Sequence, residues 1–306
     1  MRLPDISSSG NFPGELFFSG DLFHQRQMQI RYSRFSLLLI FLTACHSAGS
    51  RTEPEPAIGE FPSPLPSSPQ LSPRSSWTIQ PTTQVHRYRS EIISIIIPGE
   101  SSAGIRDSIS AIADFALTVQ RDTKGLSYSA SVEAFSVRGQ ADPSSPMSLA
   151  GRLESSQFTL NPPVTCTTQA NSVVPALQRL VIPMPLQLRK GQTWTDSTSA
   201  TLCSGSIPVT LIALRSYRVI GEISTGARTG VLLERQDKTL SAGEGSEGQH
   251  RIQLRSEGGG QTQLLIDSTT GAPIELTVAS TLTITVTTSG RSQKFIQTSR
   301  EHVTER

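Results

Sequence analysis

Apolar and polar residues alternate along much of the chain. In the clearest run, residues 274–286, Ile, Leu and Val fall on one face and mostly Thr on the other, and only Ser280 interrupts the apolar row. A period of two is typical of a β-strand that buries one face and leaves the other in water. At about 3.3 Å per residue the strand would reach roughly 43 Å, a length that favours a curved or bent sheet.

The same alternation predicts strands in other parts of the chain. Residues 113–120 and 126–132 alternate on either side of a polar turn, and the phase then slips near Ala134, as a β-bulge would produce. Turn residues at 267–271 and 287–291 join neighbouring strands as hairpins. The other predicted strands are residues 83–97, 149–160, 207–223, 230–240, 250–256 and 261–266. Because hairpin follows hairpin, we expect an antiparallel, meandering sheet.

One helix is predicted by four apolar residues at helical spacing, namely Val173, Leu177, Leu180 and Val181. Asn171 or Ser172 would cap its start, and Pro183 would end it. Ile105, Ile109 and Ile112 offer a second helical period, although the same residues could begin the strand that follows. The fold class is therefore mainly β: an antiparallel meander forming a curved sheet or an incomplete barrel or sandwich, with one or two short helices.

The N-terminal region carries an export signal. Arg31 and Arg34 precede Phe35 and an apolar run of residues 37–42, which is too short for a membrane span of about 20 residues but is typical of a signal peptide. We therefore assign residues 28–44 to the signal. Residues 1–27 fit no part of it, so we expect them to be an upstream extension with the true start at Met28. A long first region of the signal is the alternative.

The end of this signal resembles the lipobox of bacterial lipoproteins, in the residues Leu42, Thr43, Ala44 and Cys45. The resemblance implies that the signal is cut before Cys45 and that the cysteine carries the acyl chains that anchor the protein to a membrane. In that family Asp beside the cysteine retains a lipoprotein at the inner membrane. His46 follows Cys45 here, which implies the outer membrane, on the periplasmic side. The alternative is an ordinary signal peptide with an incidental cysteine.

A tether and a single domain follow the signal. Seven prolines lie between residues 46 and 76 among Ser, Glu and Gly: Pro54, Pro56, Pro62, Pro64, Pro66, Pro69 and Pro73. Such a segment favours extended polyproline conformers of about 3.1 Å per residue, so residues 45–76 should act as a semi-rigid spacer. Residues 77–306 then form one β-rich domain.

Composition argues against one class of partner. The 306 residues carry a net charge of only +2, and 6% of them are aromatic. Nucleic-acid binders usually show a clustered basic face or a platform of stacking aromatics, so we expect no nucleic-acid partner.

The three cysteines suggest one disulfide. If Cys45 is lipidated, Cys166 and Cys203 remain as a pair in an exported, oxidising compartment, and we expect them to be bonded. Two unpaired buried thiols are the alternative. The chain has no C-x-x-C arrangement that would indicate a redox-active pair.

Catalytic patterns are sparse. The histidines at 46, 86, 250 and 302 form no metal-binding motif, and no G-x-S-x-G presents a nucleophilic serine. Residues 243–248 do match G-x-G-x-x-G, but alternating segments flank them and two glutamates would repel phosphate, so a hairpin turn is predicted. Residues 258–260 read as another glycine loop, and acidic residues such as Asp196 and Glu222 stand singly. We therefore expect no enzyme, no cofactor and no metal.

Function follows only from the outline of the fold. Long half-buried strands and one helix could leave a concave apolar face, and in this the body loosely resembles curved-sheet lipoprotein carriers and exported lipid-binding proteins. Ile95, Phe115 and Leu282 would then line a pocket or simply fill the core. We expect a non-enzymatic, lipid-anchored envelope protein that binds a hydrophobic ligand or lipid. The alternative is a scaffold that binds another envelope protein through a sheet edge or the tether.

Overall fold

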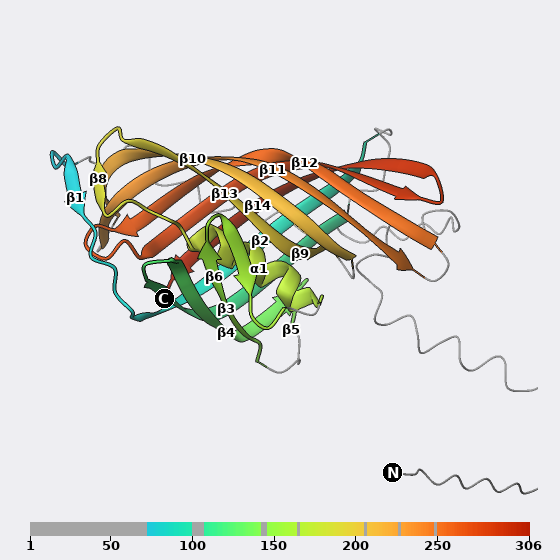
Figure 1. Cartoon of the computed structure of the whole chain (residues 1–306), viewed down its shortest axis with the longest axis horizontal. Coiled ribbons are helices and arrows are strands. Elements are labelled where there is room, and N and C mark those ends of the chain that lie inside the picture. The colour runs from blue at the N-terminus through green and yellow to red at the C-terminus, as the bar shows by residue number, and fades with distance from the viewer. Residues whose placement is uncertain are drawn as a thin grey trace, which may run out of the picture. The chain divides into compact units, whose positions relative to one another are not determined.

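The computed structural model describes residues 72–99, 107–141, 146–163, 166–204, 207–225, 228–247 and 250–306. This part of the chain is mainly β with one helix, as Figure 1 shows. The strands are β1 (Ser76–Thr78), β2 (Val85–Pro98), β3 (Asp107–Arg121), β4 (Gly125–Val137), β5 (Gln140–Ala141), β6 (Ser148–Glu154), β7 (Gln157–Leu160), β8 (Gln187–Arg189), β9 (Thr193–Ser204), β10 (Ile207–Thr225), β11 (Arg228–Glu247), β12 (His250–Asp267), β13 (Pro273–Thr288) and β14 (Arg291–Glu305). The helix is α1 (Thr168–Leu180). The helices in the described residues include none long and apolar enough to cross a membrane.

Eleven strands close into a barrel. Their order is β3-β2-β14-β13-β12-β11-β10-β9-β7-β6-β4, and a further pairing of β4 with β3 completes the circle. The short β5 adds to β4, and β1 pairs with β8 in a separate two-stranded sheet. The predicted curved, antiparallel sheet is confirmed, with one exception. β7 and β9 are parallel and pair at a single position, Gln157 with Ser199.

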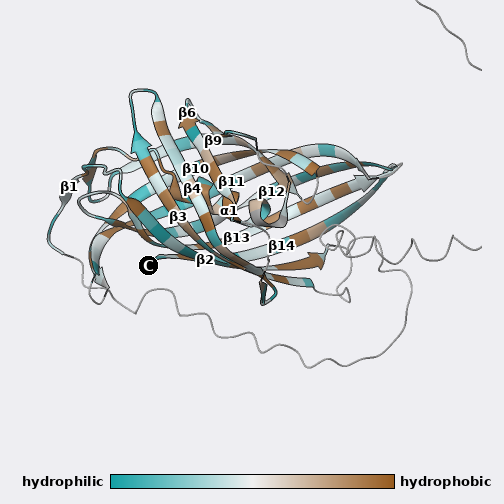
Figure 2. Ribbon diagram, turned by 90° about the horizontal axis from the view of Figure 1, so that it is seen from below, coloured by the Kyte–Doolittle hydropathy of each residue, from teal (hydrophilic) through white to brown (hydrophobic). Residues whose placement is uncertain are grey.

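The alternation read from the sequence reproduces the two faces of the sheet. Along the first half of β13, Ile274, Leu276 and Val278 are buried, and the residues between them are half-buried. Figure 2 shows the same interchange of apolar and polar positions along the strands. The register of β3 against β4 shifts opposite Asp114 and Phe115, which confirms the bulge predicted next to Ala134.

The run Gly258–Gly260 is not a loop but lies in the middle of β12, so the two strands predicted on either side of it are one. A Cβ atom at Gly259 would overlap the carbonyl oxygen of Asp237 on β11, and one at Gly258 would overlap that of Thr281 on β13. Only glycine allows both neighbours to approach so closely, which permits the sheet to bend there. Local composition alone therefore misread the middle of a continuous strand as a turn.

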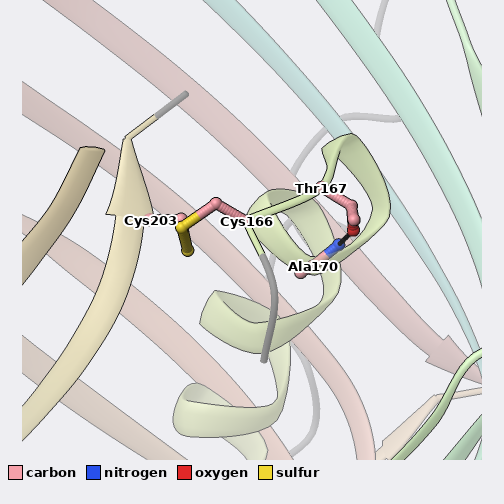
Figure 3. Close-up of a disulfide and its surroundings, with 4 residues drawn as sticks. All are labelled: Cys166, Thr167, Ala170 and Cys203. Atoms are coloured by element: carbon pink, nitrogen blue, oxygen red, sulfur yellow. Dashed lines mark hydrogen bonds between the residues drawn. A yellow bond between two sulfur atoms is a disulfide. The ribbon is translucent and has the colours of Figure 1, made fainter. Parts of the chain in front are cut away.

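Helix α1 lies against the inner face of the barrel, where Figure 1 shows it on the concave side of the sheet. Val173, Ala176 and Leu177 are fully buried, and the helix contacts β2, β3 and β9. Its cap is Thr167, whose hydroxyl accepts a hydrogen bond from the N–H of Ala170 at 3.2 Å (Figure 3), so the predicted caps at Asn171 and Ser172 are wrong. The helix begins one turn earlier than its apolar period indicates.

Of the two alternatives for Ile109 and Ile112, the strand is confirmed and the helix is wrong, because residues 107–112 are the start of β3, whereas Ile105 lies outside the described residues. Ala111, Ala113 and Phe115 form one buried row on this strand, and they pair with Ile92, Ser90 and Tyr88 of β2. Pairing with β2 over twelve positions outweighs the short helical period of three isoleucines. Phe115, which was expected in a pocket or in the core, is in the core.

Candidate functional site

A cavity of about 1410 Å³ lies beside the point where β7 meets β9. β9 pairs with β10 along its whole length, but with β7 only at Ser199, so its first half has a strand on one side only. The turn between β3 and β4, the turn between β6 and β7, and Pro183 form the other walls. The sheet contributes residues 195–197, 214–216, 236–238 and 260–261.

Two ion pairs, Asp196–Arg215 and Asp237–Arg235, form one side of the cavity, which we call its floor. The first joins β9 to β10. Nε and Nη2 of Arg215 donate to the two carboxylate oxygens of Asp196 at 2.6 and 2.9 Å. The Tyr217 hydroxyl donates to Asp196 Oδ2 at 3.2 Å, and Arg215 Nη1 donates to the carbonyl of Gln178 on α1 at 3.1 Å. This arrangement joins the wall of the barrel to the C-terminal end of the helix.

A second ion pair repeats the arrangement one strand further on. Nε of Arg235 lies 2.9 Å from a carboxylate oxygen of Asp237, and its Nη2 donates to Thr262 at 3.2 Å. Arg235 Nη1 donates to the carbonyl of Arg179 at 3.2 Å. The arginine side chains are 3% and 1% exposed, whereas those of Asp196 and Asp237 are 12% and 14% exposed and line the cavity. The carboxylates are therefore the more accessible charges of the floor.

Burial sets the protonation of the groups beneath the floor. It raises the pKa of the Tyr217 phenol to about 12, against the opposing effect of Arg215 and Arg235, so the hydroxyl stays a hydrogen-bond donor at neutral pH. Burial, together with the nearby charge of Arg235, lowers the pKa of Arg179 to about 10, and this arginine pairs with the buried Glu301. Both groups therefore keep their usual protonation state at neutral pH, so Tyr217 and Arg179 remain hydrogen-bond donors.

The predicted disulfide is confirmed. Cys166 and Cys203 are bonded with their Cα atoms 5.4 Å apart, and Figure 3 shows the bond joining the segment before α1 to the far end of β9. Cys45, the predicted lipidation site, lies outside the described residues. Ile95 and Leu282 were expected in a pocket or in the core, and neither lines the cavity.

The histidines are distributed over separate contacts. His86 lies 2.6 Å from Glu305, His302 lies 3.0 Å from Glu275, and His250 contacts Ser289, whereas His46 is outside the described residues. Within the described ranges, no three His, Cys, Asp or Glu side chains gather closely enough to hold a metal ion.

The G-x-G-x-x-G match has no room for a phosphate in its described part. Gly243–Glu247 belong to β11, and residues 248 and 249 of the predicted turn are outside the described residues. Glu244 pairs with Arg251 on β12 at 2.6 Å. A Cβ atom at Gly243 would overlap the backbone of Pro208 on β10, so this glycine serves close packing of neighbouring strands.

The sequence showed Asp196 only as an isolated carboxylate and missed the floor to which it belongs. A signal was nevertheless present in the predicted strands. Arg215 is in phase with the buried Tyr217 and Val219, and Arg235 is in phase with the buried Leu233. A charged residue in the apolar row of a strand needs a buried partner, which marks it as a candidate for a polar network.

Comparison with known proteins adds no family. No protein-family model matches the chain, and a search of curated proteins finds no match. The fold and the cavity themselves are therefore the basis for a function.

Proposed function

We propose that this protein is a non-enzymatic binding protein of the bacterial envelope, and that its ligand occupies the cavity beside β9. The observation that carries the proposal is the cavity itself. At about 1410 Å³ it exceeds the range of roughly 300–1,000 Å³ that is usual for small-molecule sites. Its lining includes the exposed Leu214, Gln236 and Lys238, so it is an open recess of the barrel wall and not a gap in the packed core.

The lining of the cavity favours an amphipathic ligand over a purely apolar one. Leu126, Leu153 and Pro183 provide apolar surface, whereas Arg121, Asp196 and Asp237 provide charge. A dry cavity with few polar groups would suit an acyl chain better. The lining therefore favours a ligand with hydrogen-bonding groups over the purely apolar lipid expected from the outline of the fold.

Export and anchoring remain part of the proposal. The Cys166–Cys203 disulfide supports an oxidising compartment such as the periplasm. With acyl chains on Cys45, the tether of residues 45–76 would hold the barrel on the periplasmic side of the outer membrane. The paired state of the buried charges supports binding rather than catalysis.

Native mass spectrometry of the full chain, after export to a bacterial periplasm, tests this function. We expect a stoichiometric adduct on the wild-type protein. Ser197→Trp places an indole on the cavity wall and should weaken ligand affinity about tenfold, equivalent to ~1.4 kcal/mol of binding free energy, and so lower the adduct occupancy. Thr201→Trp is the matched control, since it is exposed on the same face of β9 but does not line the cavity. A mass without adduct in all three proteins would contradict the proposal.

A further inference from the structure

The hydrogen bonds that flank β9 define the direction of its backbone groups. Before the strand, the N–H of Val219 on β10 donates to the carbonyl of Gln192 at 2.9 Å. Within the strand, the N–H of Ser199 donates away from β10, to the carbonyl of Ser156 at 2.8 Å. In an antiparallel pair, alternate residues bond to the same neighbour. Even-numbered residues of β9 therefore bond to β10, and the odd-numbered residues Thr195 and Ser197 direct their N–H and C=O groups to the other side.

On that other side is the cavity. Thr195 and Ser197 both line it, and β7 first pairs with β9 at Ser199. Within the described part of the chain, no strand or turn supplies hydrogen bonds to the backbone of these two residues. Unpaired backbone donors and acceptors at a sheet edge are a template for another strand. The cavity therefore has a row of main-chain groups along one wall.

The dimensions of this edge restrict what can pair with it. The free part runs from Thr193 to Thr198, about 20 Å of strand, between Gln192 and the junction with β7. The turns at 121–125 and 155–156 also line the cavity, and Ser156 closes one end of the free edge through its hydrogen bond with Ser199. A single extended chain can enter such a recess, whereas the edge of another folded sheet would meet the turns first.

We propose that the free edge of β9 binds an extended peptide segment of a partner protein, as an added strand of the barrel wall. This inference rests on the proposed function and names the ligand class of the same cavity. Main-chain hydrogen bonds to Thr195 and Ser197 supply affinity, and pockets for alternate side chains supply specificity. Every second side chain of the peptide faces the side of the sheet that carries Asp196 and Asp237, whose carboxylates, each paired with an arginine, accept further hydrogen bonds from hydroxyl, Lys or Arg side chains.

The Pro-rich tether of this chain is a poor occupant of the same edge. Between residues 62 and 69 proline recurs at every second or third position, and proline has no N–H, so this part of the tether cannot donate a full ladder of hydrogen bonds to β9. We therefore assign the edge to a peptide from another protein.

The first test uses peptides selected against the full chain from a random-peptide phage library. Synthetic versions of a selected peptide then carry a single N-methyl group at each position in turn. Strand addition predicts that methylation at every second residue weakens binding at least about tenfold, because those amides donate to β9, while methylation between them has little effect. Uniform tolerance of methylation, or failure to select any peptide, would overturn the proposal.

Variants of the protein test the backbone groups of β9 that take part in these hydrogen bonds. Thr195→Pro removes the free N–H at an edge position where proline is compatible with a strand, and should weaken peptide binding about tenfold in calorimetry. Thr195→Val keeps that N–H and should bind as the wild type does. Ser197→Pro provides a second position, and the N-methyl series decides the question if either proline variant fails to fold.

Competition separates this inference from the proposed function. If Ser197→Trp blocks a peptide that is indifferent to N-methylation, the cavity binds ligand but strand addition is wrong. If the peptide binds Ser197→Trp normally, its site is elsewhere and the inference is wrong. If a synthetic peptide of residues 46–71 displaces the selected peptide, the tether is the occupant of the edge. That result would also overturn the assignment of the edge to a partner protein.

Discussion

Replacing Arg215 with methionine should lower the free energy of unfolding by about 3 to 5 kcal/mol. The side chain is 3% exposed, and it satisfies Asp196 through two hydrogen bonds and the carbonyl of Gln178 through a third. Without the guanidinium, the carboxylate keeps only the Tyr217 hydroxyl, and the helix carbonyl loses its donor. Urea denaturation monitored by circular dichroism measures the difference.

Two further variants show whether the lost stability comes from the broken ion pair or from the loss of side-chain packing. Arg218→Met, on the exposed face of the same strand, should change stability by no more than about 0.5 kcal/mol. Asp196→Leu combined with Arg215→Met removes both charges and should be markedly less destabilised than Arg215→Met alone. A double variant as unstable as the single one would mean that the uncompensated carboxylate is not the cause.

Removing the disulfide should cost about 3 to 4 kcal/mol, the second large effect that we expect. Cys166 and Cys203 are 37 residues apart, and the closed segment contains α1, β8 and most of β9. Freeing that segment increases the entropy of the unfolded chain, so the Cys166→Ala, Cys203→Ala double variant should unfold at lower urea concentration. Reduction of the wild-type protein provides the control, because it should lose a similar amount. Equal stability of the oxidised and reduced proteins would contradict this prediction.

The fold could be predicted from the sequence where a single local pattern of apolar and polar residues decides the structure of a segment. The alternation of β13, the hairpin at 267–271 and the single helix follow from residues close together in sequence, and all three are present. The local pattern was misread as a loop at Gly258–Gly260, and at residues 107–112 it left a helix and a strand as alternatives. In both segments contacts with strands distant in sequence decide the structure: β11 and β13 enclose the glycines, and β2 pairs with the isoleucine segment.

The cavity could not be predicted because it depends on how the barrel closes. Closure requires β7 to meet β9 in parallel at one residue, which leaves the first half of β9 without a second neighbour. No periodicity marks such a contact, because parallel pairing of this kind brings together residues about forty positions apart. The floor could have been predicted more easily, because Arg215 and Arg235 occupy apolar rows of their strands and a charged residue in such a row indicates a buried partner.

The central claim is that the barrel wall is open along the first half of β9, and residue-resolved hydrogen exchange of the free protein tests it most directly. The account predicts that the amides of Asp196 and Thr198, bonded to β10, exchange slowly, while those of Thr195 and Ser197 exchange at rates near those of an unstructured chain. Protection of Thr195 and Ser197 equal to that of Asp196 would show that the edge is already paired, and would contradict both the opening and the strand-addition site.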